Sequence, residues 1–240
     1  MIIDTIMLFA AGLGNRMRHL TENSPKTLIP ILDKPILHYA LELCASYPFK
    51  KIVINTHYMH EKINESIEEF KLTRPNFPEI VIIYEEELLE TGGGVKNAIN
   101  ELGDKPIFTL NTDIVLKSKE NIFEYMLSKW SPERMDFLLL MQQYEKSVGY
   151  SGRGDFDLDS NGGLIRPDKE ENYQYVYTGL QILKPERIAR HPLKIFSLRE
   201  YYLNSERVIG IESKGIKWYH VTNPEDIVNV EMAMLSDKSV

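Results

Sequence analysis

Two cationic residues, Arg16 and Lys26, lie in a segment whose composition suits the binding of phosphate groups. The apolar run from Ile6 to Ala11 predicts a strand that is buried on both faces of a parallel sheet, and it stops at Gly12. Because Gly12 and Gly14 lack a Cβ atom, backbone N–H groups can approach an anion closely there. The segment is therefore predicted to hold a triphosphate against Arg16 and Lys26.

The spacing of this segment excludes two common phosphate-binding motifs. The dinucleotide-binding fingerprint needs a third glycine where the chain has Met17, and a Walker A loop needs Gly-Lys-Ser/Thr, whereas Lys26 follows Pro25. A tight turn with two solvated cations would explain Gly-x-Gly alone. The presence of Arg16, Pro25 and Lys26 in one loop favours the phosphate site.

Asp113 is the candidate ligand for a divalent metal ion. It ends the buried run IFTLNTD, and ligands of open α/β sheets bind beyond the carboxyl ends of the strands, where Gly12, Asn111 and Asp113 all fall. Mg²⁺ needs hard oxygen ligands and completes its shell with phosphate and water oxygens. The alternative is that Asp113 only caps a turn. The phosphate-binding loop upstream favours the metal.

The segment from Thr91 to Gly94 has two interpretations. Its glycines could let a flat base lie against the backbone while amide groups read the edge of the base. Alternatively, the segment is a glycine-rich entry into a helix. The residues alone do not separate these interpretations.

Alternating strand-like and helix-like segments predict an α/β fold with a mostly parallel, Rossmann-like sheet flanked by helices. After Met141 the sequence becomes richer in glycine. There Ser160-Asn161-Gly162-Gly163 lies between short alternating runs and predicts a hairpin in a small β-rich lid. Asn223 is expected to cap a last helix that begins at Pro224. The expected strands are Ile6–Ala11, Lys51–Asn55, Ile80–Tyr84, Pro106–Leu110, Phe137–Met141, Tyr175–Leu183, Val208–Ile211 and Lys217–His220, and the other expected helices are Leu37–Ser46, Glu61–Phe70, Gly94–Leu102, Ile122–Trp130 and Phe196–Asn204.

Composition limits the class of protein. With 240 residues and 43% hydrophobic content, the chain is expected to form a single domain, with a nucleotide-binding half over about 1–141 and a sugar-binding half over about 142–240. A net charge of −7 argues against a nucleic-acid partner. Neither a signal peptide nor a membrane span is expected, because the N-terminal apolar stretch lacks basic residues and no apolar run is long enough. The lone Cys44 is expected to be a buried hydrophobe, which fits a reducing cytoplasm.

The chain resembles the sugar-1-phosphate nucleotidyltransferases, whose opening signature is L-A-A-G-x-G-x-R-M followed by P-K. The segments that carry the resemblance extend over nearly the whole chain. They are Ala10 to Met17 with Leu20, Thr21, Pro25, Lys26, Lys34 and Pro35, then ETGGGV at 90–95, Asn111 to Asp113, VGYSGRGDF at 148–156, YTGLQIL at 177–183 and WYHVTNPEDI at 218–227. The subgroup most similar to it is that of the short bacterial N-acetylmuramate 1-phosphate uridylyltransferases of peptidoglycan recycling.

The resemblance implies the nucleotide-diphospho-sugar transferase type A fold and a set of site residues. The residues implied for the nucleotide are Ala10, Ala11, Gly12, Gly14, Thr91, Gly92 and Asn111, and those implied for the sugar are Gly149, Asp155, Thr178 and Gly179. For the two sugar-site glycines, simple turn or strand geometry is the alternative. Asp155 or Asp157 alternatively forms only the solvent face of a hairpin.

His220 departs from the family pattern. Most members have Asp-Val-Gly-Thr-Pro where this chain has His220-Val221-Thr222-Asn223-Pro224, and the aspartate is their second metal ligand. A neutral imidazole is a poor ligand for Mg²⁺ but suits softer divalent ions. The alternative is a strand-end histidine that hydrogen-bonds to a phosphate or to water.

The expected reaction joins a sugar 1-phosphate to a nucleoside triphosphate with release of pyrophosphate, and its cofactor is Mg²⁺ or Mn²⁺. Arg16, Lys26 and Asp113 are the expected catalytic residues, and His220 is a candidate second metal ligand. The resemblance implies UTP and N-acetylmuramate 1-phosphate as the preferred substrates. Alternatives are mannose-1-phosphate guanylyltransferase, another sugar-phosphate nucleotidyltransferase, or a sugar-nucleotide binding protein with impaired turnover. A monomer or weak homo-oligomer is expected.

Overall fold

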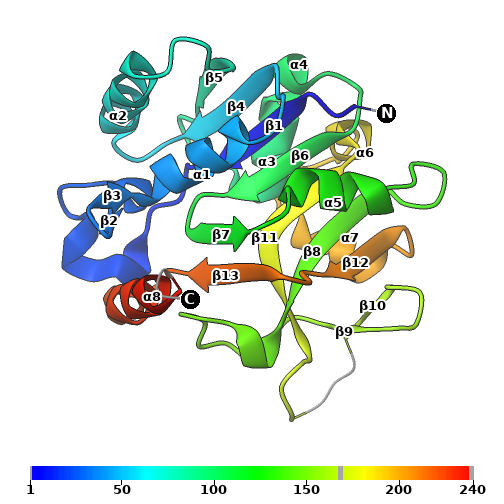
Figure 1. Ribbon diagram of the computed structural model, residues 1–240. Coiled ribbons are helices and arrows are strands. Elements are labelled where there is room, and N and C mark those ends of the chain that lie inside the picture. The colour runs from blue at the N-terminus through cyan, green and yellow to red at the C-terminus, as the bar shows by residue number, and fades with distance from the viewer. Residues whose placement is uncertain (1, 167–169, 238–240) are drawn as a thin grey trace.

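A seven-stranded sheet forms the centre of the computed structural model, which describes residues 2–166 and 170–237 (Figure 1). The strand order is β12-β8-β11-β6-β1-β4-β5. β11 is antiparallel to β6 and β8, and the other neighbours in the sheet are parallel. The predicted α/β fold with a mostly parallel sheet is confirmed. The bounds of these strands are Thr5–Phe9 (β1), Lys51–Thr56 (β4), Glu79–Tyr84 (β5), Ile107–Asn111 (β6), Phe137–Gln143 (β8), Tyr175–Leu183 (β11) and Val208–Glu212 (β12).

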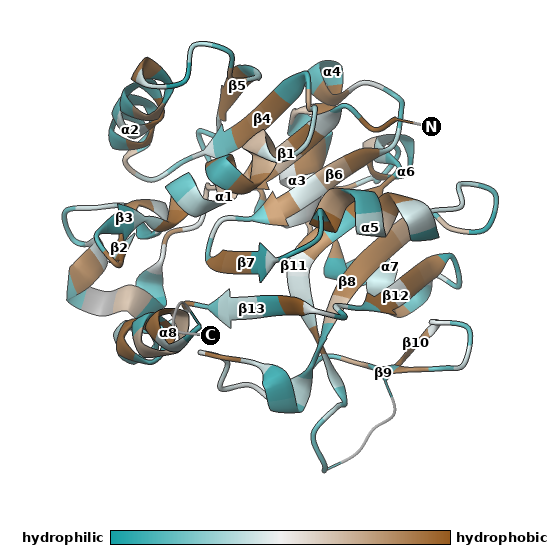
Figure 2. Ribbon diagram, viewed as in Figure 1, coloured by the Kyte–Doolittle hydropathy of each residue, from teal (hydrophilic) through white to brown (hydrophobic). Residues whose placement is uncertain are grey.

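Helices cover both faces of this sheet. Ile6 and Leu8 of β1 pack into one core with α1, α2 and α5, whereas Met7 packs into a second core with α3, α4, α6 and α7. This follows from the alternation of side chains along a strand. The strands therefore carry apolar residues on both faces, and β1, β4 and β8 are brown along much of their length in Figure 2. The helices are Ile36–Ala45 (α1), His60–Leu72 (α2), Glu90–Asn97 (α3), Ile99–Leu102 (α4), Ile122–Lys129 (α5), Pro185–Ala189 (α6), Arg199–Asn204 (α7) and Pro224–Ser236 (α8).

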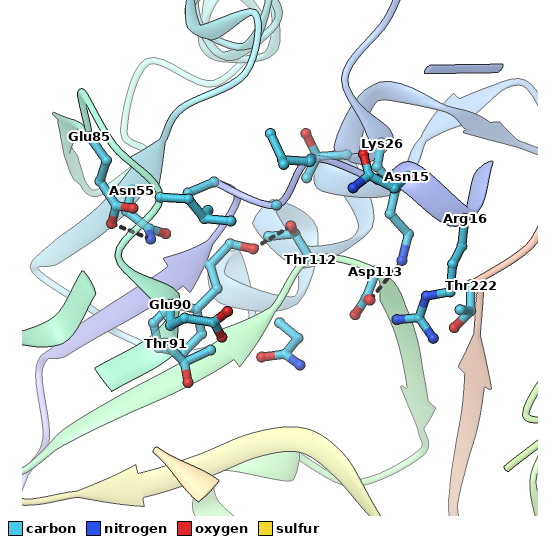
Figure 3. Close-up of a pocket in the computed structure, with 18 residues that line it drawn as sticks. Asn15, Arg16, Lys26, Asn55, Glu85, Glu90, Thr91, Thr112, Asp113 and Thr222 are labelled. Carbon is cyan, nitrogen blue, oxygen red and sulfur yellow. Dashed lines mark hydrogen bonds and ion pairs between the residues drawn. The ribbon is translucent and has the colours of Figure 1, made fainter. Parts of the chain in front are cut away.

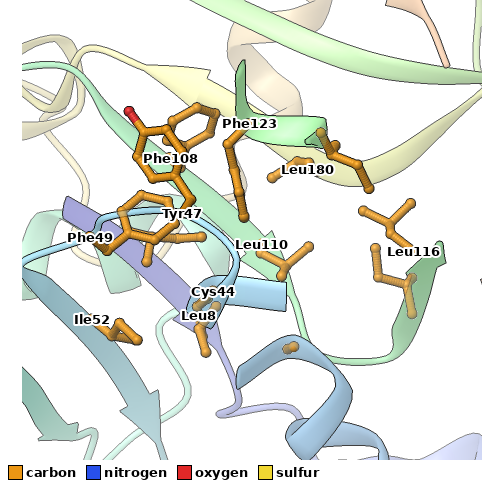
Figure 4. Packing of buried hydrophobic residues seen from close by; sticks show 14 of the residues in the cluster. Leu8, Cys44, Tyr47, Phe49, Ile52, Phe108, Leu110, Leu116, Phe123 and Leu180 are labelled. Atoms are coloured by element: carbon orange, nitrogen blue, oxygen red, sulfur yellow. The ribbon is translucent and has the colours of Figure 1, made fainter. Parts of the chain in front are cut away.

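Four aromatic rings fill the first core beside β1 and β6 (Figure 4). Phe108 and Phe123 lie 5.0 Å apart between ring centres, and Tyr47 and Phe49 lie 4.6 Å apart. Edge-to-face and tilted packing of this kind adds to the stabilisation from burial. Cys44 is fully buried in the same core, as predicted.

A two-stranded arm extends from the main sheet. β7 (Ile114–Ser118) starts directly after Asp113 and pairs antiparallel with β13 (Ile216–His220), so Ile114 lies opposite His220. β7 was not predicted. A third apolar cluster joins this arm to α8 and to the segment from Met17 to Ile36. The arm therefore connects Asp113 to the C-terminal part of the fold.

Short elements complete the structure. The predicted hairpin is confirmed by the antiparallel pair β9 (Asp157–Leu158) and β10 (Leu164–Ile165). A further antiparallel pair is formed by β2 (Pro30–Ile31) and β3 (Lys34–Pro35). Asn223 and Asp226 form a capping box at the start of α8, as the expected N-cap implied.

The prediction was wrong for the helix at 94–102. It begins four residues earlier and breaks at Ala98 into α3 and α4, because the three glycines lie inside the first helix rather than before it. Helix α6 was not predicted. Within the described part of the chain, none of the helices combines the length and the apolar character needed to cross a membrane.

Candidate active site

A cavity of about 390 Å³ lies at the carboxyl edge of the main sheet (Figure 3). Its walls come from the segments that follow β1, β4, β5 and β6, as the strand order requires. A volume of this size is within the range of small-molecule sites. The residues that line it are Phe9, Ala11, Gly12, Leu13, Gly14, Asn15, Arg16, Lys26, Thr27, Asn55, Glu85, Leu88, Glu90, Thr91, Asn111, Thr112, Asp113 and Thr222.

The glycine-rich loop forms one wall of this cavity. Gly14 has a φ of 68°, a left-handed conformation that favours glycine, and a Cβ atom there would lie 2.8 Å from Cβ of Lys26. The close approach places Lys26, which begins a short 3₁₀ turn (Lys26–Leu28), directly behind the loop. At Gly12 a Cβ would meet nothing within 4 Å, because that residue faces the open cavity. Ala10 is buried, and its N–H donates to the Asn55 side chain (3.1 Å).

Lys26 and Asp113 form an ion pair inside the cavity. Nζ of Lys26 lies 2.8 Å from Oδ2 of Asp113, and the side chains are 12% and 26% exposed. Burial alone would raise the pKa of Asp113, but Lys26 and His220 outweigh it and hold that pKa below its ordinary value. The other oxygen, Oδ1, is buried and accepts no hydrogen bond from the described residues. An orphaned carboxylate oxygen beside a phosphate-binding loop suits a hard cation.

Backbone contacts fix the position of Asp113. The hydroxyl of Thr112 donates to the carbonyl of Phe9 at 2.7 Å, which ties the turn after β6 to the end of β1. The carbonyl of Asp113 accepts from the N–H of Val221 at 3.1 Å. Three segments that lie far apart in the sequence therefore determine where this carboxylate points.

His220 approaches Asp113 from β13. Its Nε2 lies 3.9 Å from Oδ2 of Asp113, and its ring stacks on Trp218 with 5.3 Å between centres. Burial lowers the pKa of His220, so the ring is neutral at pH 7 and can act as a ligand or a hydrogen-bond partner. The hydroxyl of Thr222 lies 3.0 Å from the same nitrogen. Among the described residues, no group of three or more His, Cys, Asp or Glu side chains could hold a metal ion.

The opposite end of the cavity holds a buried Asn–Glu pair (Figure 3). Nδ2 of Asn55 donates to Oε1 of Glu85 at 2.8 Å, and Oε2 of Glu85 accepts from the N–H of Leu89 at 3.3 Å. Glu85 is 2% exposed, and burial raises its pKa. The two ends of the cavity therefore differ in chemistry: cations lie at one end, and hydrogen-bonding groups lie at the other.

The glycine-rich segment at 91–94 is a helix entry packed against its neighbour. The N–H groups of Gly92 and Gly93 both donate to the carbonyl of Phe196, at 2.9 and 3.1 Å. A Cβ on Gly92 would lie 2.3 Å from the Phe196 ring. These two amides are already paired, so the expectation that they read a base is not supported. Thr91 does line the cavity, and its hydroxyl accepts from the N–H of Leu198 at 3.0 Å.

The residues expected at the sugar lie outside the walls of this cavity, beside it. Gly179 has a φ of 91°, and a Cβ there would lie 2.9 Å from Cβ of Asn111. Gly149 has a φ of 75°, and a Cβ there would lie 2.0 Å from the carbonyl oxygen of His220. Both glycines therefore allow close packing against site residues. Thr178 is fully buried, and its hydroxyl donates to the carbonyl of Leu140 rather than facing the cavity.

Three polar residues that line the cavity, Asn55, Glu85 and Glu90, are among those that the sequence did not indicate. Asn55 is the last residue but one of β4, and Glu85 follows β5 directly; polar residues at the carboxyl ends of buried parallel strands were a usable signal. Glu90 has a φ of 63°, and nothing in its residue type announces a left-handed backbone.

Comparisons with known proteins agree with this geometry. The family model described as Nucleotidyl transferase matches residues 5–237. An N-acetylmuramate alpha-1-phosphate uridylyltransferase of Caulobacter vibrioides is 33% identical over 91% of this chain and 92% of its own length. A protein of the same name from Neisseria meningitidis serogroup B is 28% identical over 90% of this chain and 91% of its own length.

The fold is also found in solved structures. A crystal structure of HddC from Yersinia pseudotuberculosis complexed with GMP-PN has a TM-score of 0.76 at 21% identity, over 97% of this chain and 100% of that one. At this identity the likeness concerns the fold alone.

Proposed function

The chain belongs to the nucleotidyl transferase family, and we propose that it transfers a uridylyl group from UTP to N-acetylmuramate 1-phosphate in the recycling of peptidoglycan. The observation that carries the proposal is the polarity of the cavity, with Arg16, Lys26 and Asp113 at one end and the Asn55–Glu85 pair at the other. A nucleotide is complementary to this arrangement, because its anionic phosphates suit the cationic end and its base suits the hydrogen-bonding end.

In the proposed reaction, a phosphate oxygen of the sugar 1-phosphate attacks the α-phosphorus of UTP. A new P–O bond forms, the bond from the α-phosphorus to the bridging oxygen breaks, and pyrophosphate leaves with the electron pair. Arg16 would stabilise the departing pyrophosphate, and Lys26 would hold the two phosphates together. The chain needs no nucleophile of its own.

Glu85 supports the choice of uracil. An ionised carboxylate only accepts hydrogen bonds, so it suits a base that presents a ring N–H group. Uracil has such an N–H, whereas cytosine has a bare ring nitrogen at that position. Guanine also has a ring N–H, and the assay must therefore include GTP.

Divalent metal ions are commonly used in this family, and Asp113 fits one through its unpaired Oδ1. When bound, the ion would neutralise phosphate charge; we propose Mg²⁺ or Mn²⁺, with His220 as a candidate second ligand. In the structure Lys26 neutralises the same carboxylate. The ion is therefore expected to bind together with the nucleotide.

A substrate panel tests the proposal. Each of the four nucleoside triphosphates is incubated with the 1-phosphates of N-acetylmuramate, N-acetylglucosamine, mannose and glucose, and pyrophosphate is measured. UTP with N-acetylmuramate 1-phosphate should give the highest turnover. Faster reaction with GTP and mannose 1-phosphate would overturn the assignment, and pyrophosphate release with none of the pairs would indicate a binding protein.

Substitution of Glu85 tests the base. Glu85→Ala should reduce the preference for UTP over CTP by about tenfold or more, because a hydrogen bond to a charged group is lost. Glu87→Ala is the matched control, since Glu87 is 52% exposed and pairs with Lys194. An unchanged preference in Glu85→Ala would remove this residue from base recognition.

We further propose that the enzyme works in the cytoplasm as a monomer or weak homo-oligomer. A single buried thiol at Cys44 supports a reducing compartment. Sedimentation at several protein concentrations would measure the oligomeric state.

A further inference from the structure

Two guanidinium groups lie beside the β9–β10 hairpin, outside the walls of the nucleotide cavity. Nη1 of Arg199 lies 3.2 Å from Oδ1 of Asp155, and Nη1 of Arg166 donates to the carbonyl of Asp155 at 2.9 Å. Both guanidinium carbons also lie near the buried Phe156 ring, at 5.8 Å for Arg166 and 6.0 Å for Arg199. Asp155 thus meets Arg199 through its carboxylate and Arg166 through its backbone carbonyl.

Hydrogen bonds connect this arginine pair to the nucleotide cavity. The residue before Arg199, Leu198, donates its N–H to the hydroxyl of Thr91, which lines the cavity. Oδ2 of Asp155 accepts from the N–H of Tyr177 at 3.0 Å. The Asp155–Arg199 pair is therefore fixed from both sides.

Tyr150 connects the same pair to the phosphate end. Its ring centre lies 5.9 Å from that of His220, which faces Asp113. Burial and the nearby Asp155 raise the pKa of the Tyr150 phenol, and Arg199 opposes them. Side chains therefore lead from Asp113 through His220 to Tyr150, whose phenol is within electrostatic reach of Asp155 and Arg199.

We propose that Arg199 selects a sugar 1-phosphate that carries a carboxylate. The inference rests on the proposed function, because N-acetylmuramate differs from N-acetylglucosamine by a lactyl ether that ends in a carboxylate. Arginine presents several N–H donors in a planar fork that matches a carboxylate. Asp155 holds the guanidinium in place, and the Arg199 side chain remains 44% exposed to a substrate.

The test compares two acceptors in one variant. Arg199→Gln should lower kcat/KM for N-acetylmuramate 1-phosphate by about tenfold or more, since a charge-assisted pair is lost, and should change kcat/KM for N-acetylglucosamine 1-phosphate by less than about threefold. Arg199→Lys keeps the charge and should retain part of the preference. Arg207→Gln is the matched control, because Arg207 is 39% exposed and pairs with Asp136 at the start of β8.

The outcomes separate this inference from the proposed function. If wild type transfers uridylyl groups to neither acceptor, the proposed function fails, and the inference fails with it. If wild type is active but Arg199→Gln lowers both acceptors equally, or lowers neither, the specificity role is wrong while the transfer reaction stands. Calorimetry with UDP-N-acetylmuramate and UDP-N-acetylglucosamine gives the same comparison in binding, and equal weakening of both there would also overturn the inference.

Discussion

Replacing Lys26 with methionine should strengthen the binding of a divalent metal ion to the nucleotide-free protein, although it removes most of the turnover. Nζ of Lys26 lies 2.8 Å from Oδ2 of Asp113, and both side chains are largely buried. The ammonium group therefore holds the carboxylate that a metal ion would use, and its charge repels the ion. Methionine has a similar length and no charge.

The structure sets the size of the effect. Two unit charges 4 Å apart interact by about 4 kcal/mol at an effective dielectric constant of about 20, and a divalent ion doubles this to about 8 kcal/mol. Because water in the cavity screens this interaction, we take about a quarter of that value, which is about 2 kcal/mol. A difference of about 2 kcal/mol corresponds to metal binding that is about 30-fold tighter in the variant. Turnover should fall by about 10² to 10³ through the loss of a preorganised cation.

Calorimetry with Mn²⁺ and no nucleotide measures the first effect, and pyrophosphate release measures the second. Lys34→Met is the matched control, because Lys34 pairs with Glu42 on the surface and should leave both quantities unchanged. The gain in affinity should disappear in the double variant with Asp113→Ala. If Lys26→Met binds Mn²⁺ no more tightly than wild type, or if the gain survives loss of Asp113, competition for this carboxylate is refuted.

Three further predictions concern the site and its support. Gly149→Ala should lower the free energy of unfolding in urea by about 3 kcal/mol, because its Cβ would lie 2.0 Å from the carbonyl oxygen of His220. Gly215→Ala, with a φ of 71° and open space, should cost only about 1 kcal/mol, and equal losses would contradict this account. Asp136→Asn should cost about 2 kcal/mol at pH 7. Three cations hold the pKa of Asp136 below its ordinary value of 3.8 despite its burial. The loss of unfolding free energy in Asp136→Asn should therefore shrink when urea titrations are made at pH values below 3.8, where the carboxylate of the wild type becomes protonated. A loss that does not change with pH would exclude an ionic origin. Asp113→Ala should abolish pyrophosphate release, whereas His220→Asp should remain active. Near-normal release in Asp113→Ala would show that Asp113 is not an essential ligand of the metal ion.

The sheet could be predicted because its evidence is local. Strands β1, β4 and β8 contain continuous apolar runs, and such runs are typical of strands in a sheet that helices cover on both faces. The phosphate loop was also local, since Gly14, Arg16 and Lys26 lie within one short segment. This loop lines the cavity because it follows β1, and the carboxyl ends of parallel strands meet at one edge of the sheet.

The parts that could not be predicted depend on distant partners. β7 was missed because it follows β6 after a two-residue turn, and only β13, about a hundred residues later, shows that Ile114–Ser118 is a separate strand. The glycines of α3 left two interpretations open, a base-binding segment or a helix entry, and the close approach of Phe196 to Gly92 cannot be read from the sequence. The hydrogen bond between Asn55 and Glu85 joins the ends of the neighbouring strands β4 and β5, and neither residue type alone indicates that the two side chains meet.

The third apolar cluster has a consequence for the order in which this protein becomes active during synthesis. Met17, Ile29 and Ile31 support the phosphate loop, and they are buried against Tyr219, Val221 and Val230. Leu32 is further held by the carboxylate of Glu231, at 2.7 Å from its N–H. A nascent chain on the ribosome therefore lacks the floor of its phosphate site until residues 216–236 have emerged. A ribosome-bound chain in which residues 1–215 have left the exit tunnel should therefore contain all strands of the main sheet but show no turnover.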